Sequence, residues 1–99
     1  MATSADYRDY IVEQLSKLDD IMCKPMMGEY LLYYNGLLFG GIYDNRLLIK
    51  KTETNGHYRM EEQIPYPGAK PMYMADSIDN RELLEEIVID TFRGLKKKK

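Results

Sequence analysis

The side chains in this sequence that are most able to carry chemistry are a single histidine, His57, and a single cysteine, Cys23. A catalytic dyad that uses either residue type would depend on one of these positions alone. His57 follows Asn55-Gly56, a pair typical of tight turns, so we expect an exposed surface histidine. Lys24 adjoins Cys23, and a nearby cation lowers a thiol pKa, but neighbouring residues of a strand point to opposite faces. We therefore expect Cys23 to be buried and unreactive.

Metal ligands and cofactor motifs are sparse. One histidine, one cysteine and scattered carboxylates do not provide the four ligands of a zinc site. The acidic pairs Asp19-Asp20 and Glu61-Glu62 are most simply solvated surface. No glycine-rich loop opens a helix after a strand, so a phosphate-binding fingerprint is missing. The sequence predicts no catalytic residue, no metal and no cofactor, and hence a protein that is not an enzyme.

Length and composition predict one small folded domain that spans residues 1–99. Hydrophobic residues make up 44% of the chain, which is ordinary for a globular protein, so disorder is not expected. A lone cysteine cannot form an intramolecular disulfide and fits a reducing compartment. Residues 1–10 lack the apolar core of a signal peptide, and no apolar run approaches the roughly 20 residues that span a bilayer. We therefore expect a soluble cytoplasmic protein without a membrane partner.

Charge is unevenly distributed along the chain. The net charge is −2, although Lys96, Lys97, Lys98 and Lys99 together contribute +4. The rest of the chain is therefore acidic, at −6. An acidic body disfavours the phosphate contacts that dominate affinity for nucleic acids, and the lysine run is most simply a solvated terminus. We expect DNA contact to be weak at most and to depend on these four lysines.

Two stretches have the spacing of amphipathic helices. The first runs from about residue 4 to residue 19, and Ser4 can cap its start. The second lies near the C-terminus, where Ser77 or Asp79 can cap the start and Gly94 is placed to end it. The apolar positions are Tyr7, Tyr10, Ile11, Leu15 and Leu18 in the first helix, and Leu84, Ile87, Val88, Thr91 and Leu95 in the second.

Between these helices, turn residues separate runs of strand-forming residues. Residues 30–34 lead into Asn35-Gly36, the favoured pair of a two-residue hairpin, and residues 37–43 return. Asp44-Asn45 supplies a second turn before a strand over residues 46–51. Residues 21–26 can add a strand, and residues 72–74 can add another at the sheet edge. The pattern predicts an α+β fold, with an antiparallel sheet of four to five strands between an N-terminal and a C-terminal helix.

Gly40 and Gly41 lie inside the second of these strands, where glycine normally weakens the structure. Their position indicates a β-bulge or a close approach by another element. We favour a packed helix over a ligand as that element.

Three prolines, Pro65, Pro67 and Pro71, frame a stiff and ordered loop, because proline fixes φ and removes a donor. The loop and the residues after it contain the candidate partner surface, which consists of Tyr66, Lys70, Met72 and Tyr73. Tyrosine is enriched at interface cores, and methionine adapts to imperfectly matched surfaces. The competing interpretation is that the same residues pack the last helix against the sheet. The same two interpretations, a binding surface or core packing, apply to the methionines, and we favour core filling. These methionines are at positions 22, 26, 27, 60, 72 and 74.

Three segments resemble the N-terminal domain of the TfoX/Sxy competence regulators. They are Met27-Gly28-Glu29-Tyr30 followed by Tyr34-Asn35-Gly36-Leu37-Leu38-Phe39, then Ile42-Tyr43-Asp44-Asn45-Arg46-Leu47-Leu48-Ile49-Lys50, and then Tyr66-Pro67-Gly68-Ala69-Lys70-Pro71-Met72-Tyr73. The resemblance implies a fold similar to type III secretion chaperones, a cytoplasmic location, and a link to the transcriptional regulation of DNA uptake. It implies no catalytic residues. Full-length regulators of this kind also carry a second, C-terminal domain.

These observations favour a non-catalytic protein-binding or regulatory module. Its expected partner is another protein or a second copy of the chain in a homodimer. The alternative is a small-ligand-binding protein, or an enzyme of unknown reaction type, with its pocket behind the proline loop. The missing nucleophile–base pair favours the first interpretation.

Overall fold

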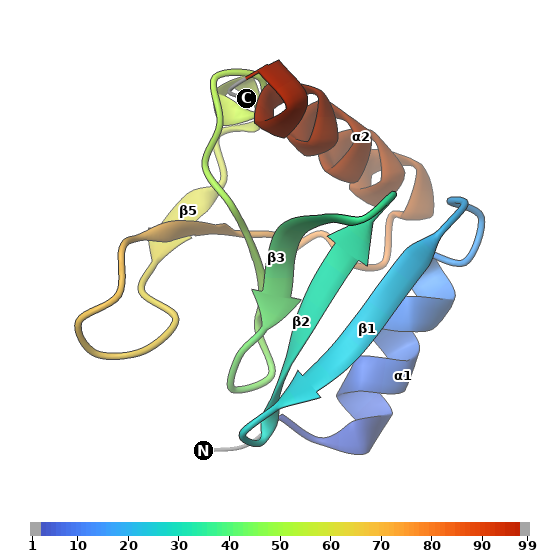
Figure 1. Ribbon diagram of the computed structural model, residues 1–99, viewed down its shortest axis with the longest axis vertical. Coiled ribbons are helices and arrows are strands. Elements are labelled where there is room, and N and C mark those ends of the chain that lie inside the picture. The colour runs from blue at the N-terminus through green and yellow to red at the C-terminus, as the bar shows by residue number, and fades with distance from the viewer. Residues whose placement is uncertain (1–2, 98–99) are drawn as a thin grey trace.

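The computed structural model describes residues 3–97 (Figure 1). The order of helix, strands and helix confirms the predicted α+β class. Figure 1 shows the two helices, α1 and α2, packed against a curved sheet, with the β5 region standing off to one side. The elements are α1 (Ala5–Gln14), β1 (Ile21–Met26), β2 (Glu29–Tyr34), β3 (Leu37–Ile42), β4 (Leu47–Ile49), the 3-10 helix η1 (Gly56–Tyr58), β5 (Glu61–Gln63), β6 (Met72–Met74) and α2 (Arg81–Lys97).

Six strands form one antiparallel sheet in the order β1-β2-β3-β4-β6-β5. This is one strand more than the four to five predicted from the sequence. The additional strand is β5, whose residues Glu-Glu-Gln carry no strand signal and which pairs only with β6. The expectation that residues 72–74 lie at the edge is wrong, because β6 is inserted between β4 and β5.

Tight turns join consecutive strands as the turn residues predict. The backbone φ angle is 51° at Asn35 and 82° at Gly36, and it is 52° at Asp44 and 57° at Asn45. Positive φ at both central residues is typical of the type I′ turn, whose twist matches that of the paired strands. The β3–β4 turn is closed by two hydrogen bonds between the backbones of Tyr43 and Arg46, at 2.9 and 3.0 Å.

The predicted bulge lies in β3. Leu32 pairs with Gly40 but Tyr33 pairs with Leu38, so Phe39 is the extra residue on the bulged strand. A Cβ atom on Gly40 would lie 2.2 Å from the carbonyl oxygen of Leu48. The close approach is therefore made by the backbone of β4, and the expectation of a helix there is wrong.

The core lies between the two helices and one face of the sheet. Leu32, Phe39 and Ile49 of the sheet are fully buried there with residues of both helices, and Tyr34 makes an edge-on contact with the Phe92 ring at 4.9 Å. Burial of a large apolar side chain of this kind contributes about 1.5–3 kcal/mol to stability. The core residues from the helices are Ile11 and Leu15, and Leu84, Ile87 and Val88.

Both helices differ from the prediction at their ends. Helix α1 stops at Gln14 and is followed by turns, five residues before the expected end. Helix α2 is capped by Asn80, whose Oδ1 accepts the Leu83 N–H at 3.1 Å, and by neither Ser77 nor Asp79. Over residues 3–97, neither helix has the length and apolar character needed to cross a membrane.

Gly94 does not end α2, which continues to Lys97. The glycine is buried, and a Cβ atom there would lie 2.5–2.8 Å from the side chains of Thr52 and Thr54. Because glycine has no side chain, the segment after β4 can pack closely against the helix. Gly94 therefore serves tertiary packing and does not terminate the helix.

Candidate functional site

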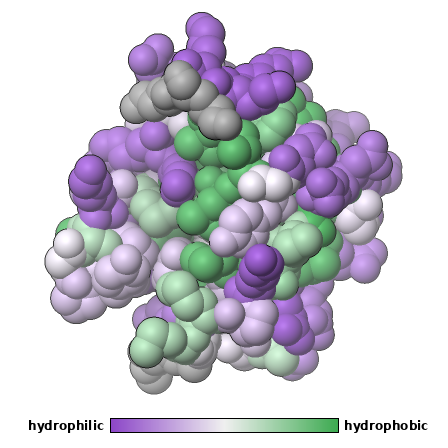
Figure 2. Space-filling view, in the orientation of Figure 1, coloured by the Kyte–Doolittle hydropathy of each residue, from purple (hydrophilic) through white to green (hydrophobic). Residues whose placement is uncertain are grey.

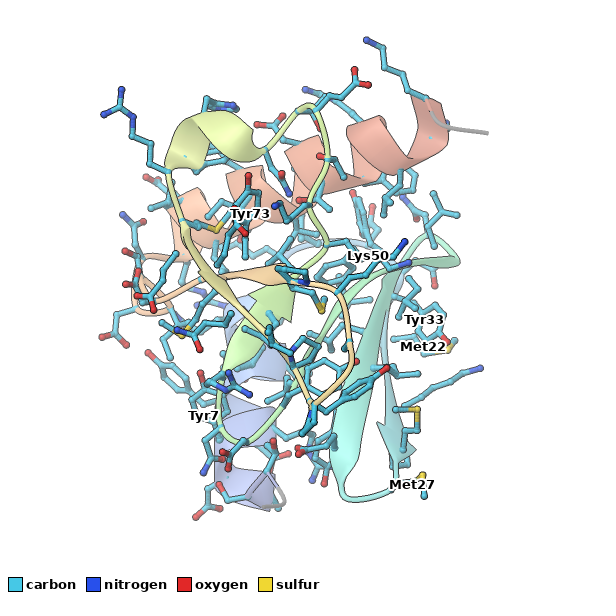
Figure 3. The ribbon with its side chains drawn as sticks, turned by 90° about the vertical axis from the view of Figure 1, so that its left-hand side faces the viewer. Tyr7, Met22, Met27, Tyr33, Lys50 and Tyr73 are labelled. Atoms are coloured by element: carbon cyan, nitrogen blue, oxygen red, sulfur yellow. The ribbon has the colours of Figure 1, made fainter. Side chains whose placement is uncertain are left out.

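The proline loop, defined as residues 64–71, connects β5 to β6 and folds over the outer face of the sheet, the face turned away from the helices (Figure 3). Its tip is a tight turn in which the Ala69 N–H donates to the Tyr66 carbonyl at 3.1 Å. Pro67 occupies the second position and Gly68 the third, with a φ of 88°. This arrangement is typical of a type II turn, which favours proline and then glycine at these positions. The sequence therefore specifies the shape of the tip.

Arg46 ties the start of the proline loop to the β3–β4 turn. One guanidinium nitrogen donates to the Gln63 side-chain oxygen at 3.1 Å and to the Ile64 carbonyl at 3.4 Å. The other donates to the Pro65 carbonyl at 3.4 Å, and Nε donates to the Tyr43 carbonyl at 3.1 Å. Two of these contacts reach the loop, one reaches the end of β5 and one stays within the β3–β4 turn. A single rigid guanidinium group therefore holds the start of the loop in place over the sheet.

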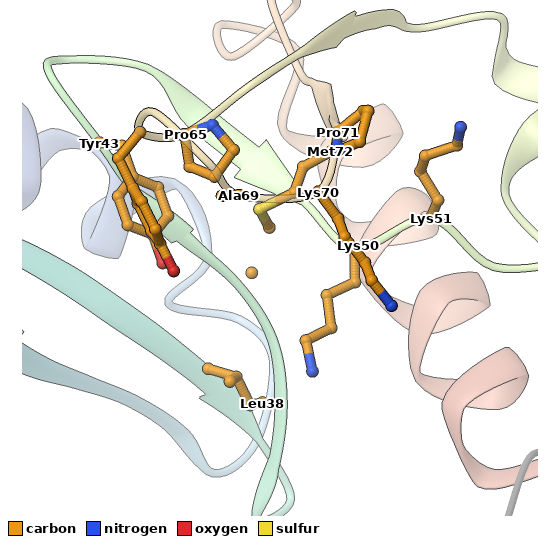
Figure 4. A pocket seen from close by; sticks show the side chains of 11 residues that line it. Leu38, Tyr43, Lys50, Lys51, Pro65, Ala69, Lys70, Pro71 and Met72 are labelled. Carbon is orange, nitrogen blue, oxygen red and sulfur yellow. The ribbon is translucent and has the colours of Figure 1, made fainter.

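A cleft of about 590 Å³ lies between the proline loop and the outer face (Figure 4). Its volume falls in the range of roughly 300–1,000 Å³ that is usual for small-molecule sites. The sheet side contributes Leu38, Gly40, Tyr43, Lys50 and Lys51, and the loop side contributes Pro65, Tyr66, Ala69, Lys70, Pro71 and Met72.

One end of the cleft is cationic. Lys50, Lys51 and Lys70 line this end, away from Tyr43, and Figure 4 shows the Lys51 amine pointing away from the other two. Lys51 is paired, since its Nζ lies 3.0 Å from a Glu62 carboxylate oxygen. Lys50 and Lys70 form no ion pair with any residue between positions 3 and 97. Two uncompensated lysines therefore face the same space.

The other end of the cleft is aromatic. The rings of Tyr43 and Tyr66 lie with centroids 6.2 Å apart and planes inclined by 55°. Tyr43 is only 7% exposed, and burial raises the pKa of its hydroxyl above the ordinary value. A tyrosine hydroxyl is protonated at neutral pH, so Tyr43 provides a hydrogen-bond donor.

The four residues of the predicted partner surface are not all brought together. Tyr66, Lys70 and Met72 line the cleft. Tyr73 packs toward the core cluster on the other face of the sheet, with the Lys51 Nζ 5.5 Å from its ring centroid. Adjacent strand residues point to opposite faces, so Met72 and Tyr73 cannot share one surface.

Sequence reasoning missed Leu38, Tyr43 and Lys50 as parts of the cleft. Each lies in or next to a predicted strand, and nothing near them in the chain indicates a loop arriving from residues 64–71. Alternation along the strands could have placed Leu38 on the face opposite the buried Phe39. It could not have shown what covers that face.

Neither His57 nor Cys23 lies in the cleft. The His57 side chain is 64% exposed, as predicted, and its Nε2 lies 3.9 Å from an Asp90 carboxylate oxygen that also accepts the Tyr58 hydroxyl. Cys23 is half-buried against the core, and burial raises the pKa of its thiol, which weakens it as a nucleophile. Within residues 3–97, no three histidine, cysteine or acidic side chains are grouped to hold a metal ion.

Beside the cleft, the outer face of β1–β3 is partly apolar and uncovered. Met22 and Met26 are 47% and 38% exposed, and the Lys24 Nζ lies 5.3 Å from the Tyr33 ring centroid. Figure 3 shows Met22 and Tyr33 on the side opposite α1, and Figure 2 shows apolar side chains gathered in the middle of this face. Core filling is therefore wrong for these two methionines, and for Met27, which is 98% exposed in the β1–β2 turn.

Part of the lysine run lies outside the described residues. Lys96 and Lys97 are exposed in the last turn of α2, and the Lys96 Nζ lies 5.5 Å from the Phe92 ring centroid. Lys98 and Lys99 lie beyond the range that the structure describes.

Comparison with known proteins gives two matches. A family model described as the TfoX N-terminal domain matches residues 13–89, a range that contains every strand of the sheet and the whole proline loop. A relative from Spirochaeta aurantia is 36% identical over 80 residues, which cover 79% of this chain and 70% of the relative. That relative is described as an uncharacterized 12.7 kDa protein in the trpE 5′ region.

Proposed function

The chain belongs to the TfoX N-terminal domain family, and from that premise we propose that it is a non-catalytic regulatory module that binds another protein through its proline loop. The observation that carries the proposal is a pair of exposed apolar side chains on a loop that is held in place. Ile64 is 52% exposed and Tyr66 is 54% exposed, and they lie two residues apart. Large apolar side chains presented in this way are typical of interaction sites.

The construction of the loop supports a binding role. The three prolines and the contacts of Arg46 restrict the free loop, so little conformational entropy would be lost when a partner binds. Tyr66 adds a broad apolar face with a polar tip, a residue type enriched at interfaces. Lys70 and Met72 would contribute from the cleft side, whereas Tyr73 would support the loop from the core.

Replacement of Tyr66 with alanine tests the proposal. Since the side chain is half exposed, we expect the free energy of unfolding to change by less than about 1 kcal/mol. Loss of an interface tyrosine should weaken association by roughly tenfold or more. Pull-down from the native cell with mass spectrometry would measure capture of a partner, and sedimentation would measure self-association.

The matched control is Tyr10→Ala, which truncates a tyrosine that is 39% exposed on α1, away from the loop. It should leave association unchanged. The competing interpretation, in which Tyr66 is a core residue, predicts destabilisation by about 3–5 kcal/mol. A strongly destabilised Tyr66→Ala protein with unaltered association per folded molecule would show that the loop is packing and not a contact surface.

A second measurement addresses DNA. If the four terminal lysines supply the only dense positive charge, the logarithm of DNA affinity should fall with the logarithm of salt concentration with a slope of about −3 to −4. Deletion of residues 96–99 should abolish binding at physiological salt. Sequence-specific binding that survives this deletion would contradict the proposed protein-binding role and favour a direct role at DNA.

A further inference from the structure

The cleft under the proline loop has two chemically different ends and apolar walls. We propose that it binds a small molecule in which a carboxylate or phosphate group is attached to a flat aromatic body. The cationic end would take the anionic group and the tyrosine end would take the ring. This proposal goes beyond the protein-binding role, although both use Tyr66, Lys70 and Met72. Ile64 belongs to the protein-binding surface alone, because it is exposed on the loop and does not line the cleft.

Two of the three lysines at the cationic end have no acidic partner among the described residues. The third lysine is Lys51, whose Nζ lies 3.0 Å from a Glu62 carboxylate oxygen. Lys50 and Lys70 remain without an ion pair among residues 3–97, although acidic side chains outnumber basic ones in the sequence. Like charges that share one end of a cleft repel each other, and an anion placed between them would relieve that repulsion. An anionic group is therefore the complementary occupant.

The backbone of Lys50 is fixed, so its side chain starts from a defined position. Its N–H donates to the Phe39 carbonyl at 2.8 Å, and its carbonyl accepts from the Asn55 side chain at 2.8 Å. Asn55 itself is fully buried. Lys70 arrives from the other wall, on the loop that Arg46 holds against the sheet. The two cations thus come from two separately anchored elements.

The rest of the cleft suits a flat ring. Leu38 and Met72 supply apolar walls, and methionine adjusts to irregular shapes. Tyr43 and Tyr66 both line the cleft and are inclined to each other by 55°. Aromatic rings prefer edge-on or offset contacts, which these two side chains can offer to a ligand ring. Tyr43 lines the cleft, and its hydroxyl makes no hydrogen bond with other residues of the described range. It can therefore bond to a polar group of a ligand.

The test is an NMR titration of the 15N-labelled protein with three probes of similar shape. 2-Naphthoate carries a carboxylate, 2-naphthyl phosphate carries a phosphate, and 2-naphthamide is uncharged. We expect amide shifts to concentrate at Leu38, Gly40, Lys50, Ala69 and Lys70. At least one anionic probe should bind about tenfold more tightly than the amide, because two exposed ion pairs are gained. The stronger of the two anions identifies the class of natural ligand.

A double variant, Lys50→Met with Lys70→Met, removes both charges and keeps the apolar stems. It should bind all three probes with the weak affinity of the amide. The matched control is Lys17→Met with Lys97→Met, which changes the net charge equally at exposed sites away from the cleft and should bind as the unchanged protein does. The spectrum of each variant shows directly whether it is folded.

Three results would overturn the proposal. They are equal affinity for charged and uncharged probes, shifts that map outside the cleft, and an equal loss of affinity in the control variant. Ile64→Ala separates this proposal from the protein-binding role, because Ile64 is exposed on the loop and does not line the cleft. Loss of partner capture with normal preference for the anionic probe would leave the ligand site standing alone.

Discussion

Alanine at position 40 is expected to destabilise the protein by about 3 kcal/mol or more, because it overpacks a closed backbone contact. The added Cβ would lie 2.2 Å from the Leu48 carbonyl oxygen and 3.1 Å from the Ile49 Cα. Backbone atoms of a paired strand cannot move aside as a flexible side chain can. Either the β3–β4 pairing opens or the bulge at Phe39 shifts, and Phe39 is a fully buried core residue.

The control for Gly40→Ala is Gly36→Ala, which tests a glycine of a different kind. Gly36 has a φ of 82°, and a Cβ atom there would meet nothing within 4 Å. The substitution therefore costs only the strain of an alanine in a left-handed backbone conformation. That strain is expected to cost about 1–2 kcal/mol. Urea unfolding of both variants measures the difference. If Gly40→Ala is no more destabilised than Gly36→Ala, the tight β3–β4 approach is not a feature of the folded protein.

Truncation of Asn55 to alanine is the second substitution with a large expected effect, about 3 kcal/mol of lost stability. Asn55 is fully buried, with an exposed fraction of 0%. Its side-chain oxygen accepts the Thr52 N–H at 3.0 Å, and its nitrogen donates to the Lys50 carbonyl and to the Thr91 hydroxyl, each at 2.8 Å. An unpaired buried polar group costs about 1–3 kcal/mol, and this substitution leaves several.

The control for Asn55→Ala is Asn80→Ala, which removes the exposed cap of α2 and should cost only about 1 kcal/mol. Urea unfolding again measures both variants. Because Asn55 also holds the backbone of Lys50, its loss should broaden or shift the Lys50 amide signal in variants that still fold. Equal destabilisation of the two variants would mean that the buried network contributes no more than a surface cap.

Both substitutions act on the framework of the cleft. Gly40 lies on its floor, and Asn55 fixes Lys50 at its cationic end. The segment after β4 and the bulged strand β3 therefore do more than fill the core. They set the position of the sheet side of the site, while Arg46 sets the position of the loop side.

Local features of the sequence were sufficient to predict several elements. Asn35-Gly36 specifies its hairpin because two consecutive residues with positive φ are tolerated by few residue pairs. The bulge beside Gly40 and the ordered proline loop follow from the same kind of short-range preference. The helical stripe of α2 was likewise legible from the spacing of Leu84, Ile87 and Val88, since one face of a helix repeats every three to four residues.

Other elements depended on contacts with residues outside their own segment of the chain. Strand β5 consists of polar residues and becomes a strand because β6 pairs with it. The neighbours of Gly94 in the chain indicate a helix stop, but the position needs a glycine because Thr52 and Thr54 pack against it. In neither case is the deciding partner next to the segment in the chain, since β6 lies beyond the proline loop and Thr52 and Thr54 precede the whole β5–β6 region. No pattern within the segment itself could therefore indicate it.

The same division applies to the candidate site. The sequence by itself determined that the proline loop is stiff, that Tyr66 and Lys70 belong to it, and that His57 is exposed. Only the tertiary structure decided that the loop lies over β3 and β4, which brings Lys50 and Tyr43 to Lys70 and Tyr66 and sends Tyr73 to the opposite face. The physical reason is the separation along the chain over which each kind of interaction acts. Backbone preferences act between neighbouring residues, whereas a cleft forms between segments whose meeting depends on strand order, the register shift at Phe39 and the contacts of Arg46.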